Sequence, residues 1–196
     1  MKLYFAPGAC SLADHIALNE AEIAHDRIKV DLKAHQTEDG RDYYAVNPKG
    51  YVPALELDDG QILTENIAIL IYIAETVGRM LPARGIERYR ALEMLAFIST
   101  ELHKNYKAFY NPVASDAEKD EAHATLAKRF AFVGEKLNGN RFLLGDLISV
   151  ADCYLFVMLL WARKFEVELP PSLLSYFDRM RDRPSILKSL KEEGLS

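Results

Sequence analysis

The chain has 196 residues, 49% apolar and 27% charged, which is the composition of an ordinary soluble globular protein. Its formal charge of −5 and its lack of a basic cluster argue against nucleic acid or an anionic membrane as a partner. The apolar run 156–161 is far shorter than the ~20 residues of a membrane span, and the first residues do not have the pattern of a secretory signal. Because there are only two cysteines, Cys10 and Cys153, we expect no disulfide framework, and a reducing cytoplasm is the natural compartment.

The first 32 residues have the pattern of a β-α-β unit. Residues 2–5 predict a buried strand, residues 11–21 a helix, and residues 27–32, which alternate polar and apolar side chains, a second strand. Cys10 therefore lies where the first strand leads into a helix. Unpaired N–H groups and the helix dipole favour a thiolate there, so this position predicts a reactive cysteine with a lowered pKa. The alternative is a small buried apolar residue, which is what most cysteines are.

The next segment completes a small α/β domain. Turn residues at 47–50 precede a hairpin whose strands, 54–57 and 61–64, flank Asp58-Asp59-Gly60. A helix is expected from Glu65 onward, with Thr64 as its N-cap. Residues 33–46 are polar and suit a loop with one short helix. The predicted order is β-α-β-(α)-β-β-α, which is the thioredoxin layout.

Everything after a linker is predicted to be helical. We expect a first domain at 1–78, a linker at 79–86 and an all-α domain at 87–196. The expected long helices are 87–109 and 116–137, and prolines separate two shorter ones near the end. Ser149 and Asp152 resemble a capping box at the start of an apolar helix. That helix is predicted to form the centre of the second core, with Cys153 as a structural residue.

Three groups outside the Cys10 turn can carry chemistry. A cis Val52–Pro53 bond would turn the Val52 N–H and C=O outward to pair with a bound peptide, whereas an ordinary trans proline is the alternative. Glu65, at a helix start, suits an ammonium group, although a solvent-facing glutamate is the simpler interpretation. His103 is either a catalyst or a core histidine. No resolving cysteine follows Cys10 at the C-x-x-C spacing, and no metal-ligand or phosphate-loop pattern is present.

Taken together, these features resemble the glutathione transferases, most closely the bacterial beta class, over essentially the whole chain. The motifs that carry the resemblance are Lys2-Leu3-Tyr4-Phe5, Gly8-Ala9-Cys10-Ser11-Leu12, Asn47-Pro48-Lys49-Gly50, Val52-Pro53-Ala54-Leu55, Leu63-Thr64-Glu65-Asn66, Thr100-Glu101-Leu102-His103-Lys104 and Ser149-Val150-Ala151-Asp152. The resemblance implies a thioredoxin-like glutathione domain, an all-helical second domain and a homodimer whose active site lies near the interface. It implies no permanently bound cofactor, with glutathione as a co-substrate.

The resemblance also implies roles for residues of the first domain. Cys10 is expected to face the glutathione sulfur. Val52 is expected to hold the cysteinyl backbone, with cis-Pro53 setting its geometry, and Glu65 and Asn66 to take the γ-glutamyl end.

In the second domain the implied glutathione contacts come from one helix. His103, with Lys104 beside it, is expected to approach the thiol side of the site, where a protonated imidazole would lower the thiol pKa. Glu101 is expected to reach toward the ligand of the partner subunit.

Four positions depart from the family pattern. Asn66 stands where serine is usual, and His35 where a lysine often meets the glycyl carboxylate, which would weaken binding as the pH rises. Tyr51 replaces a glutamine that commonly precedes the Val-Pro pair. Ala96 replaces an asparagine near the thiol.

The leading hypothesis for function is the transfer of glutathione to hydrophobic electrophiles. The electrophile pocket is expected between the domains, lined by the Cys10 turn, Tyr106, Phe109 and Tyr110. One alternative is thiol–disulfide or peroxide reduction through a Cys10–glutathione mixed disulfide. Another is a non-catalytic protein of the same fold that binds apolar ligands.

Overall fold

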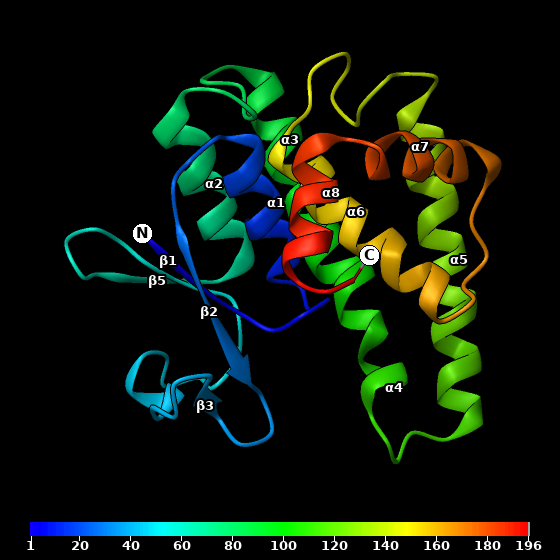
Figure 1. The fold of residues 1–196 in the computed structure, drawn as a ribbon. Helices are drawn as coiled ribbons and strands as arrows, with labels where there is room; N and C mark the ends of the chain where they lie inside the picture. Colours follow the sequence, from blue (N-terminus) through cyan, green and yellow to red (C-terminus); the bar gives the residue numbers. More distant parts are fainter. Residues whose placement is uncertain (196) are drawn as a thin grey trace. The chain divides into compact units, whose positions relative to one another are not determined.

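The computed structural model describes residues 1–195, and its contacts divide the chain into two compact units (Figure 1). Unit 1 comprises residues 1–79 together with 182–196, and unit 2 comprises residues 80–181. The sequence placed a domain boundary at a linker over 79–86 and residues 87–196 in the helical domain. In this division the described residues 182–195 belong to unit 1. Within the described chain, no helix is both long and apolar enough to span a membrane.

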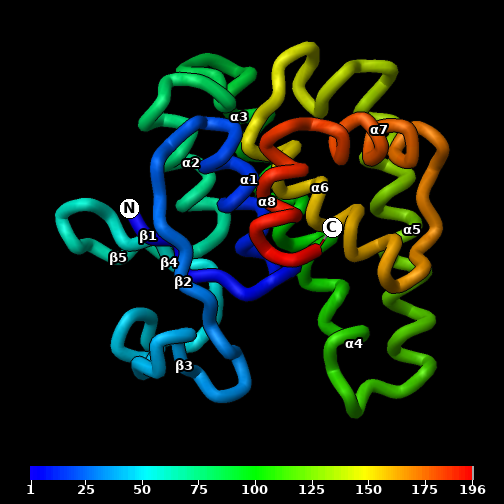
Figure 2. The backbone as a smooth tube through the Cα atoms, viewed as in Figure 1, coloured from blue at the N-terminus to red at the C-terminus, as the bar shows by residue number. Residues whose placement is uncertain are grey.

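Unit 1 is built on a five-stranded mixed sheet of order β3-β2-β1-β4-β5 (Figure 2). Its strands are β1 (Lys2–Phe5), β2 (Asp26–Asp31), β3 (Gln36–Thr37), β4 (Ala54–Glu56) and β5 (Ile62–Thr64). The central strand β1 pairs in parallel with β2 and antiparallel with β4, and β5 closes the hairpin. The thioredoxin-like layout is confirmed. The short edge strand β3 was not predicted, because its two residues lie in a polar stretch without periodicity.

The alternation of side chains along the strands gives the sheet two apolar faces. Leu3 pairs with Leu55 in register, and Tyr4 pairs with Ala54, so the two pairs point to opposite faces. On the Tyr4 face, Tyr43 and Val52 pack into one buried cluster. The loop that carries Val52 is thereby fixed against the sheet.

Three helices and one turn complete unit 1. They are α1 (Leu12–Glu20), the 3₁₀ turn η1 (Tyr43–Ala45), α2 (Asn66–Val77) and α8 (Pro184–Glu192). Helix α1 packs against both α2 and α8, and all of its residues from Leu12 to Leu18 are buried. Because α8 covers α1, the end of the chain becomes part of the N-terminal unit.

Unit 2 is helical throughout. Its elements are α3 (Ile86–Phe97), the π-helical turn η2 (Ile98–Leu102), the 3₁₀ turn η3 (His103–Tyr106), α4 (Lys107–Tyr110), α5 (Asp116–Leu137), α6 (Val150–Lys164) and α7 (Pro171–Arg181). As expected, α6 is buried almost all round and forms the centre of this core, with Cys153 fully buried in it. Helix α5 begins and ends where predicted, and Asn138 follows it in the left-handed region.

Two local expectations were wrong. The single helix expected over 87–109 is divided by the turns η2 and η3, which place His103 at an irregular point of the backbone. The N-cap of α2 is Glu65, at φ +75°, whereas Thr64 still belongs to β5. A positive φ is unusual for a residue with a side chain and often marks a functional position.

Candidate functional site

Cys10 lies in the turn between β1 and α1, as predicted. It is half-buried, and its Sγ donates to the carbonyl oxygen of Val52 at 3.5 Å. Val52 itself is buried, and the Val52–Pro53 peptide bond is cis. Within unit 1 the structure therefore brings Cys10 together with Val52 and Pro53, three residues proposed from the sequence.

The acidity predicted for Cys10 is wrong for this structure. Burial, followed by the charge of Asp14, raises the pKa of the Cys10 thiol to about 12. The backbone N–H groups of Cys10 and Ser11 act in the expected direction and lower it, but they are outweighed. The sequence argument counted the helix terminus and missed the buried carboxyl group four residues later. Cys10 is a thiol donor in this structure.

Asp14 is a fully buried acidic side chain that the sequence analysis did not single out. The amide of Asn66 is oriented by its neighbours, because only one orientation places a donor against two acceptor oxygens. In that orientation its nitrogen donates to Asp14 Oδ2 at 2.6 Å and to the Cys10 carbonyl at 3.2 Å. Asn66 thus connects the first residue of α2 to the start of α1. The available signal was an acidic residue among the apolar residues Leu12, Ala13 and Ile16 at the start of α1.

The Glu65 side chain is exposed and already has two partners. Lys49 Nζ forms an ion pair with Glu65 Oε1, and the Tyr51 hydroxyl donates to the same oxygen at 2.7 Å. The hydrogen bond from Lys49, then the one from Tyr51 and last the charge of Lys49 lower the pKa of Glu65, so its carboxylate is charged at neutral pH. These two partners hold a negative charge at the N-terminus of α2, where an ammonium group can compete with Lys49.

His35 lies beside the Val52 loop. Its Nδ1 is 3.1 Å from the carbonyl oxygen of Gly50, and its ring lies 4.5 Å from that of Tyr44 between centroids. A Cβ at Gly50 would meet Tyr44 at 2.7 Å, so only glycine fits this close approach. The imidazole is thus held against Gly50, two residues before Val52 in the chain, and its role toward the glycyl carboxylate stays a prediction.

Glu193, which caps the C-terminus of α8, supports the Cys10 turn, and sequence reasoning missed this contact. The buried Glu193 carboxylate accepts from the Gly8 N–H at 2.9 Å, and its other oxygen lies 2.9 Å from His15 Nδ1. The second His15 nitrogen lies 2.9 Å from Glu192 Oε2. In the sequence, Glu192 and Glu193 have the pattern of ordinary surface charges at the end of a polar helix, so no local signal revealed this contact.

His103 in unit 2 is largely enclosed by aromatic rings. Its Nδ1 lies 2.6 Å from the Tyr154 hydroxyl, and its ring meets those of Tyr154 and Trp161 edge-on. Burial lowers the pKa of His103 to about 4, so the imidazole is neutral at neutral pH. The expectation that a protonated His103 lowers a thiol pKa is therefore wrong for this structure.

The two charged neighbours of His103 have different settings. Lys104 is exposed. Glu101 forms an ion pair with Arg129 of α5 at 2.8 Å within the same chain. The role of Glu101 toward a partner subunit remains a prediction from the resemblance.

Of the three aromatic residues expected to line the electrophile pocket, Tyr106 belongs to the core. It has no exposed surface, and its hydroxyl donates to the Met158 carbonyl at 2.7 Å. Phe109 is half-buried and stacks on Phe165, and Tyr110 is 49% exposed. Only Phe109 and Tyr110 therefore present a surface that an apolar molecule can contact without moving the core.

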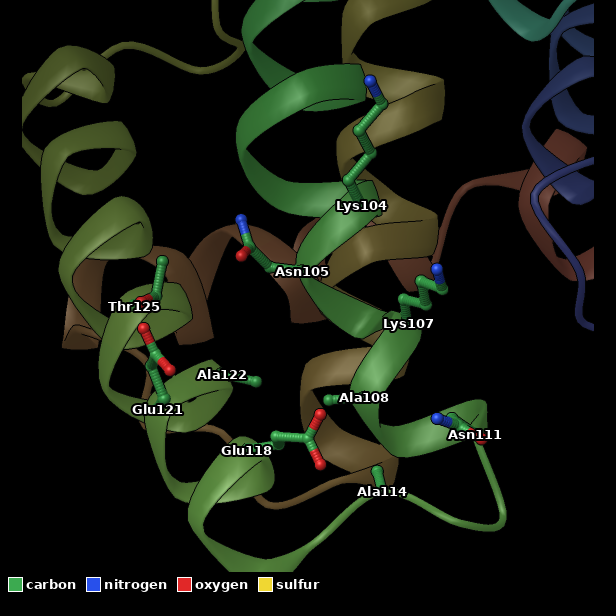
Figure 3. Close-up of a pocket in the computed structure, with 10 residues that line it drawn as sticks. All are labelled: Lys104, Asn105, Lys107, Ala108, Asn111, Ala114, Glu118, Glu121, Ala122 and Thr125. Carbon is green, nitrogen blue, oxygen red and sulfur yellow. The ribbon is translucent and has the colours of Figure 1, made fainter.

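A separate pocket of about 340 Å³ lies between α4 and the first half of α5 (Figure 3). Its lining residues are Lys104, Asn105, Lys107, Ala108, Asn111, Ala114, Glu118, Glu121, Ala122 and Thr125. This lining is mostly polar and shares only Lys104 with the predicted site. It does not have the apolar walls expected for a hydrophobic electrophile.

The capping box of α6 is confirmed. Asp152 Oδ2 accepts from the Ser149 N–H at 2.8 Å and from its hydroxyl at 2.6 Å. The other oxygen accepts from the Leu143 N–H at 2.9 Å and from the Tyr176 hydroxyl at 2.7 Å. This buried carboxyl is structural. No group of metal-ligating side chains occurs among residues 1–195.

Comparison with known proteins supports the resemblance. Models of the glutathione S-transferase N-terminal and C-terminal domains match residues 9–76 and 89–184. The chain is 42% identical over 200 residues to glutathione S-transferase GstA of Escherichia coli O157:H7, covering 100% of both. It superposes with a TM-score of 0.96 on BphK, a bacterial transferase solved as a ternary complex, at 45% identity and 100% coverage of both chains. A sphingomonad glutathione S-transferase complexed with glutathione matches at 42% identity and TM-score 0.94, again over both full chains.

The chain belongs to the glutathione S-transferase family. Its structural neighbours include bacterial beta-class members, the class to which its sequence motifs pointed. With the family established, the geometry of the Cys10 turn bears on how such an enzyme works in this chain.

Proposed function

We propose that this chain conjugates reduced glutathione to hydrophobic electrophiles and that Cys10 assists as a neutral thiol donor. The observation that carries the proposal is the Cys10 thiol itself, which stays protonated because burial, the largest cause, raises its pKa to about 12. It already donates to the Val52 carbonyl at 3.5 Å. A bound glutathione sulfur would replace that carbonyl as the acceptor. A hydrogen bond to the thiolate is stronger than one to the thiol, so it favours the reactive form.

Unit 1 offers a complementary group for each part of glutathione. The Val52 backbone pairs with the cysteinyl residue in the manner of an added strand. The N-terminus of α2 receives the γ-glutamyl carboxylate, and Glu65 attracts the ammonium group in competition with Lys49. His35, held beside Gly50, is available to the glycyl carboxylate. These assignments follow the family resemblance, and the chemistry of each residue within unit 1 supports them.

The chemical step is a substitution or an addition at carbon. The glutathione thiol releases its proton to water, and its sulfur lone pair forms the new carbon–sulfur bond. In a substitution the bond to the leaving group breaks with its electron pair, and in an addition the carbanion takes a proton from water. No bond to Cys10 forms, so its hydrogen bond stabilises the nucleophile without a redox step.

We assign the electrophile to the accessible aromatic surface of Phe109 and Tyr110. These residues adjoin Trp161 and Phe165, whose rings lie about 5 Å from that of Tyr110. The proposed state is a homodimer, as in the resemblance, and α3 carries two exposed apolar side chains, Ile86 and Tyr89, suited to a contact. Light scattering tests the dimer, and a Tyr110→Ala variant with a higher KM for apolar electrophiles tests the surface.

The role of Cys10 is tested by comparing Cys10→Ser with Cys10→Ala. Glutathione binding is followed by calorimetry and conjugation with 1-chloro-2,4-dinitrobenzene by absorbance. A hydroxyl can still donate, so Cys10→Ser should retain much of kcat, whereas Cys10→Ala should lose about tenfold or more. Cys153→Ala is the control, because that buried residue lies in the core of unit 2. If Cys10→Ser abolishes conjugation, or if only mixed disulfides are reduced, the hydrogen-bond role is wrong and the mixed-disulfide alternative replaces it.

A further inference from the structure

The carboxyl group of Asp14 is buried without a hydrogen-bond partner for each of its oxygens. Its side chain is completely buried, and Oδ1 has no hydrogen-bond partner among the described residues. A buried carboxylate normally has donors for both oxygens, because an unpaired charge is costly away from water. Here Asn66 supplies one donor, at 2.6 Å from Oδ2. Burial and the charge of Glu193 raise the pKa of Asp14 well above its ordinary value, which favours the neutral acid.

The contact with Asp14 also determines which hydrogen bonds the Asn66 side chain makes. Its amide nitrogen donates to Asp14 and to the Cys10 carbonyl, so both of its hydrogens are engaged inside unit 1. Asn66 is also 9% exposed. A ligand carboxylate at the N-terminus of α2 would therefore meet backbone N–H groups, with the Asn66 side chain acting as a brace beneath them.

An ionised Asp14 would oppose that ligand. It would place a negative charge one hydrogen bond away from the residue that begins α2, inside the protein where charges are poorly screened. The other titratable groups that act here are Cys10 in the turn before α1, Glu65 at the start of α2 with its partner Lys49, and Glu193 just after α8 with its partner His15. Lys49 is already paired with Glu65 and His15 with Glu193, so these groups do not compensate a second anion.

We propose that Asp14 is an uncharged positioning residue for the γ-glutamyl carboxylate of glutathione, holding Asn66 against the Cys10 carbonyl, and that its ionisation weakens binding at that subsite. This inference rests on the proposed binding of glutathione to unit 1. In this inference the Asn66 side chain makes its hydrogen bonds within unit 1. The pH above which ligand binding weakens is set by Asp14, which does not touch the ligand.

The test is the affinity for S-methylglutathione between pH 6 and pH 10, measured by calorimetry for the full chain and for Asp14→Asn. The methylated ligand has no thiol to titrate, and its amino group titrates identically with both proteins. Above the pKa of Asp14, the Kd of the parent protein should rise relative to that of Asp14→Asn, by up to about tenfold per pH unit. Asp26→Asn, an exposed carboxylate in β2, should follow the parent protein.

Further variants separate a charge effect from a packing effect. Cys10→Ala should keep the pH difference, because the titrating group is Asp14. Asn66→Ala should raise Kd at every pH, because the brace is gone. Asp14→Leu, of similar size, removes the ionisation if Asp14→Asn does not fold. Parallel pH profiles for the parent and Asp14→Asn, with binding retained, overturn this inference alone. No binding by the parent at any pH overturns the proposed function as well.

Discussion

Two buried carboxyl groups, Asp14 in unit 1 and Asp152 in unit 2, lie near the start of their helices and have opposite settings. Asp152 accepts four hydrogen bonds, two on each oxygen, from Leu143, Ser149 and Tyr176. Asp14 accepts one from Asn66, and its second oxygen has no partner among the described residues. Burial raises the pKa of both, but hydrogen bonds counteract it more fully at Asp152.

Both carboxyl groups are buried, so the difference lies in their hydrogen bonds. Many bonds make Asp152 a structural group, whereas Asp14 has few bonds and its ionisation can change. The donors around Asp152 would all lose their acceptor together, so replacing it should destabilise the fold. Asp14 accepts only one hydrogen bond from another side chain, and burying its ionisable carboxyl group costs free energy. A neutral replacement should therefore be tolerated or stabilising.

The largest effect is expected from Asp152→Ala. The variant leaves two buried N–H groups and two hydroxyls without an acceptor, which should lower the free energy of unfolding by about 3 kcal/mol or more. Urea unfolding followed by circular dichroism measures it. Asp178→Ala, on the exposed side of α7, is the control and should change stability by less than about 0.5 kcal/mol. A loss below about 1 kcal/mol for Asp152→Ala would remove the contrast with Asp14.

Asp14→Asn should act in the opposite direction. We expect it to raise the free energy of unfolding at pH 7 by about 1 kcal/mol or more, because asparagine keeps the acceptor for Asn66 and cannot ionise. The pKa of Asp14 is raised in the folded state, so the folded parent binds more protons than the unfolded chain above about pH 4. The parent should lose stability relative to the variant as pH rises from there toward the folded pKa.

This prediction is checked by urea titrations of both proteins at pH 4, 5.5 and 7. The difference between them should be smallest at pH 4, where Asp14 is protonated in the folded state and only about half ionised in the unfolded chain. If the difference stays constant over this range, the ionisation of Asp14 has no part in the stability of unit 1.

The two cysteines should also differ in reactivity, since Cys10 lies near Asp14 and Cys153 lies near Asp152. Alkylation by iodoacetamide from pH 6 to pH 10, read by peptide mass spectrometry, should show Cys10 reacting only above the ~8.5 midpoint of an ordinary thiol. In Asp14→Asn the Cys10 profile should move to lower pH, because the negative charge that raises its pKa is removed. Cys153 should stay unmodified in both proteins, since it is fully buried. A Cys10 midpoint below 8.5 would restore the thiolate predicted from sequence.

The smallest effect is expected from removing single donors to Asp152. Ser149→Ala and Tyr176→Phe each delete one of its four hydrogen bonds and should lower stability by about 1 kcal/mol. Calorimetry should show unchanged glutathione affinity in the folded proteins. Reduced turnover at unaltered stability would mean that this network serves the reaction.

Much of this architecture was predictable from local patterns. Alternation and turn residues located β1, β2, β4 and β5, and the Ser149–Asp152 spacing located the start of α6, because such signals involve neighbours in the chain. The two-residue strand β3 escaped, and so did the break at His103, because neither interrupts an apolar period strongly. The proline–valine pair was singled out by its residue type, and its cis bond is present.

The sequence by itself determined the family, the order of elements and the candidate residues Cys10, Val52, Glu65 and His103. Only the tertiary structure decided the charge states of the titratable ones. The pKa of Cys10 is set by burial and by Asp14, and that of His103 by burial alone. Burial depends on what the rest of the fold places around a side chain. The packing of α8 on α1, which brings Glu193 to Gly8 across most of the chain length, is likewise a contact that no local pattern encodes.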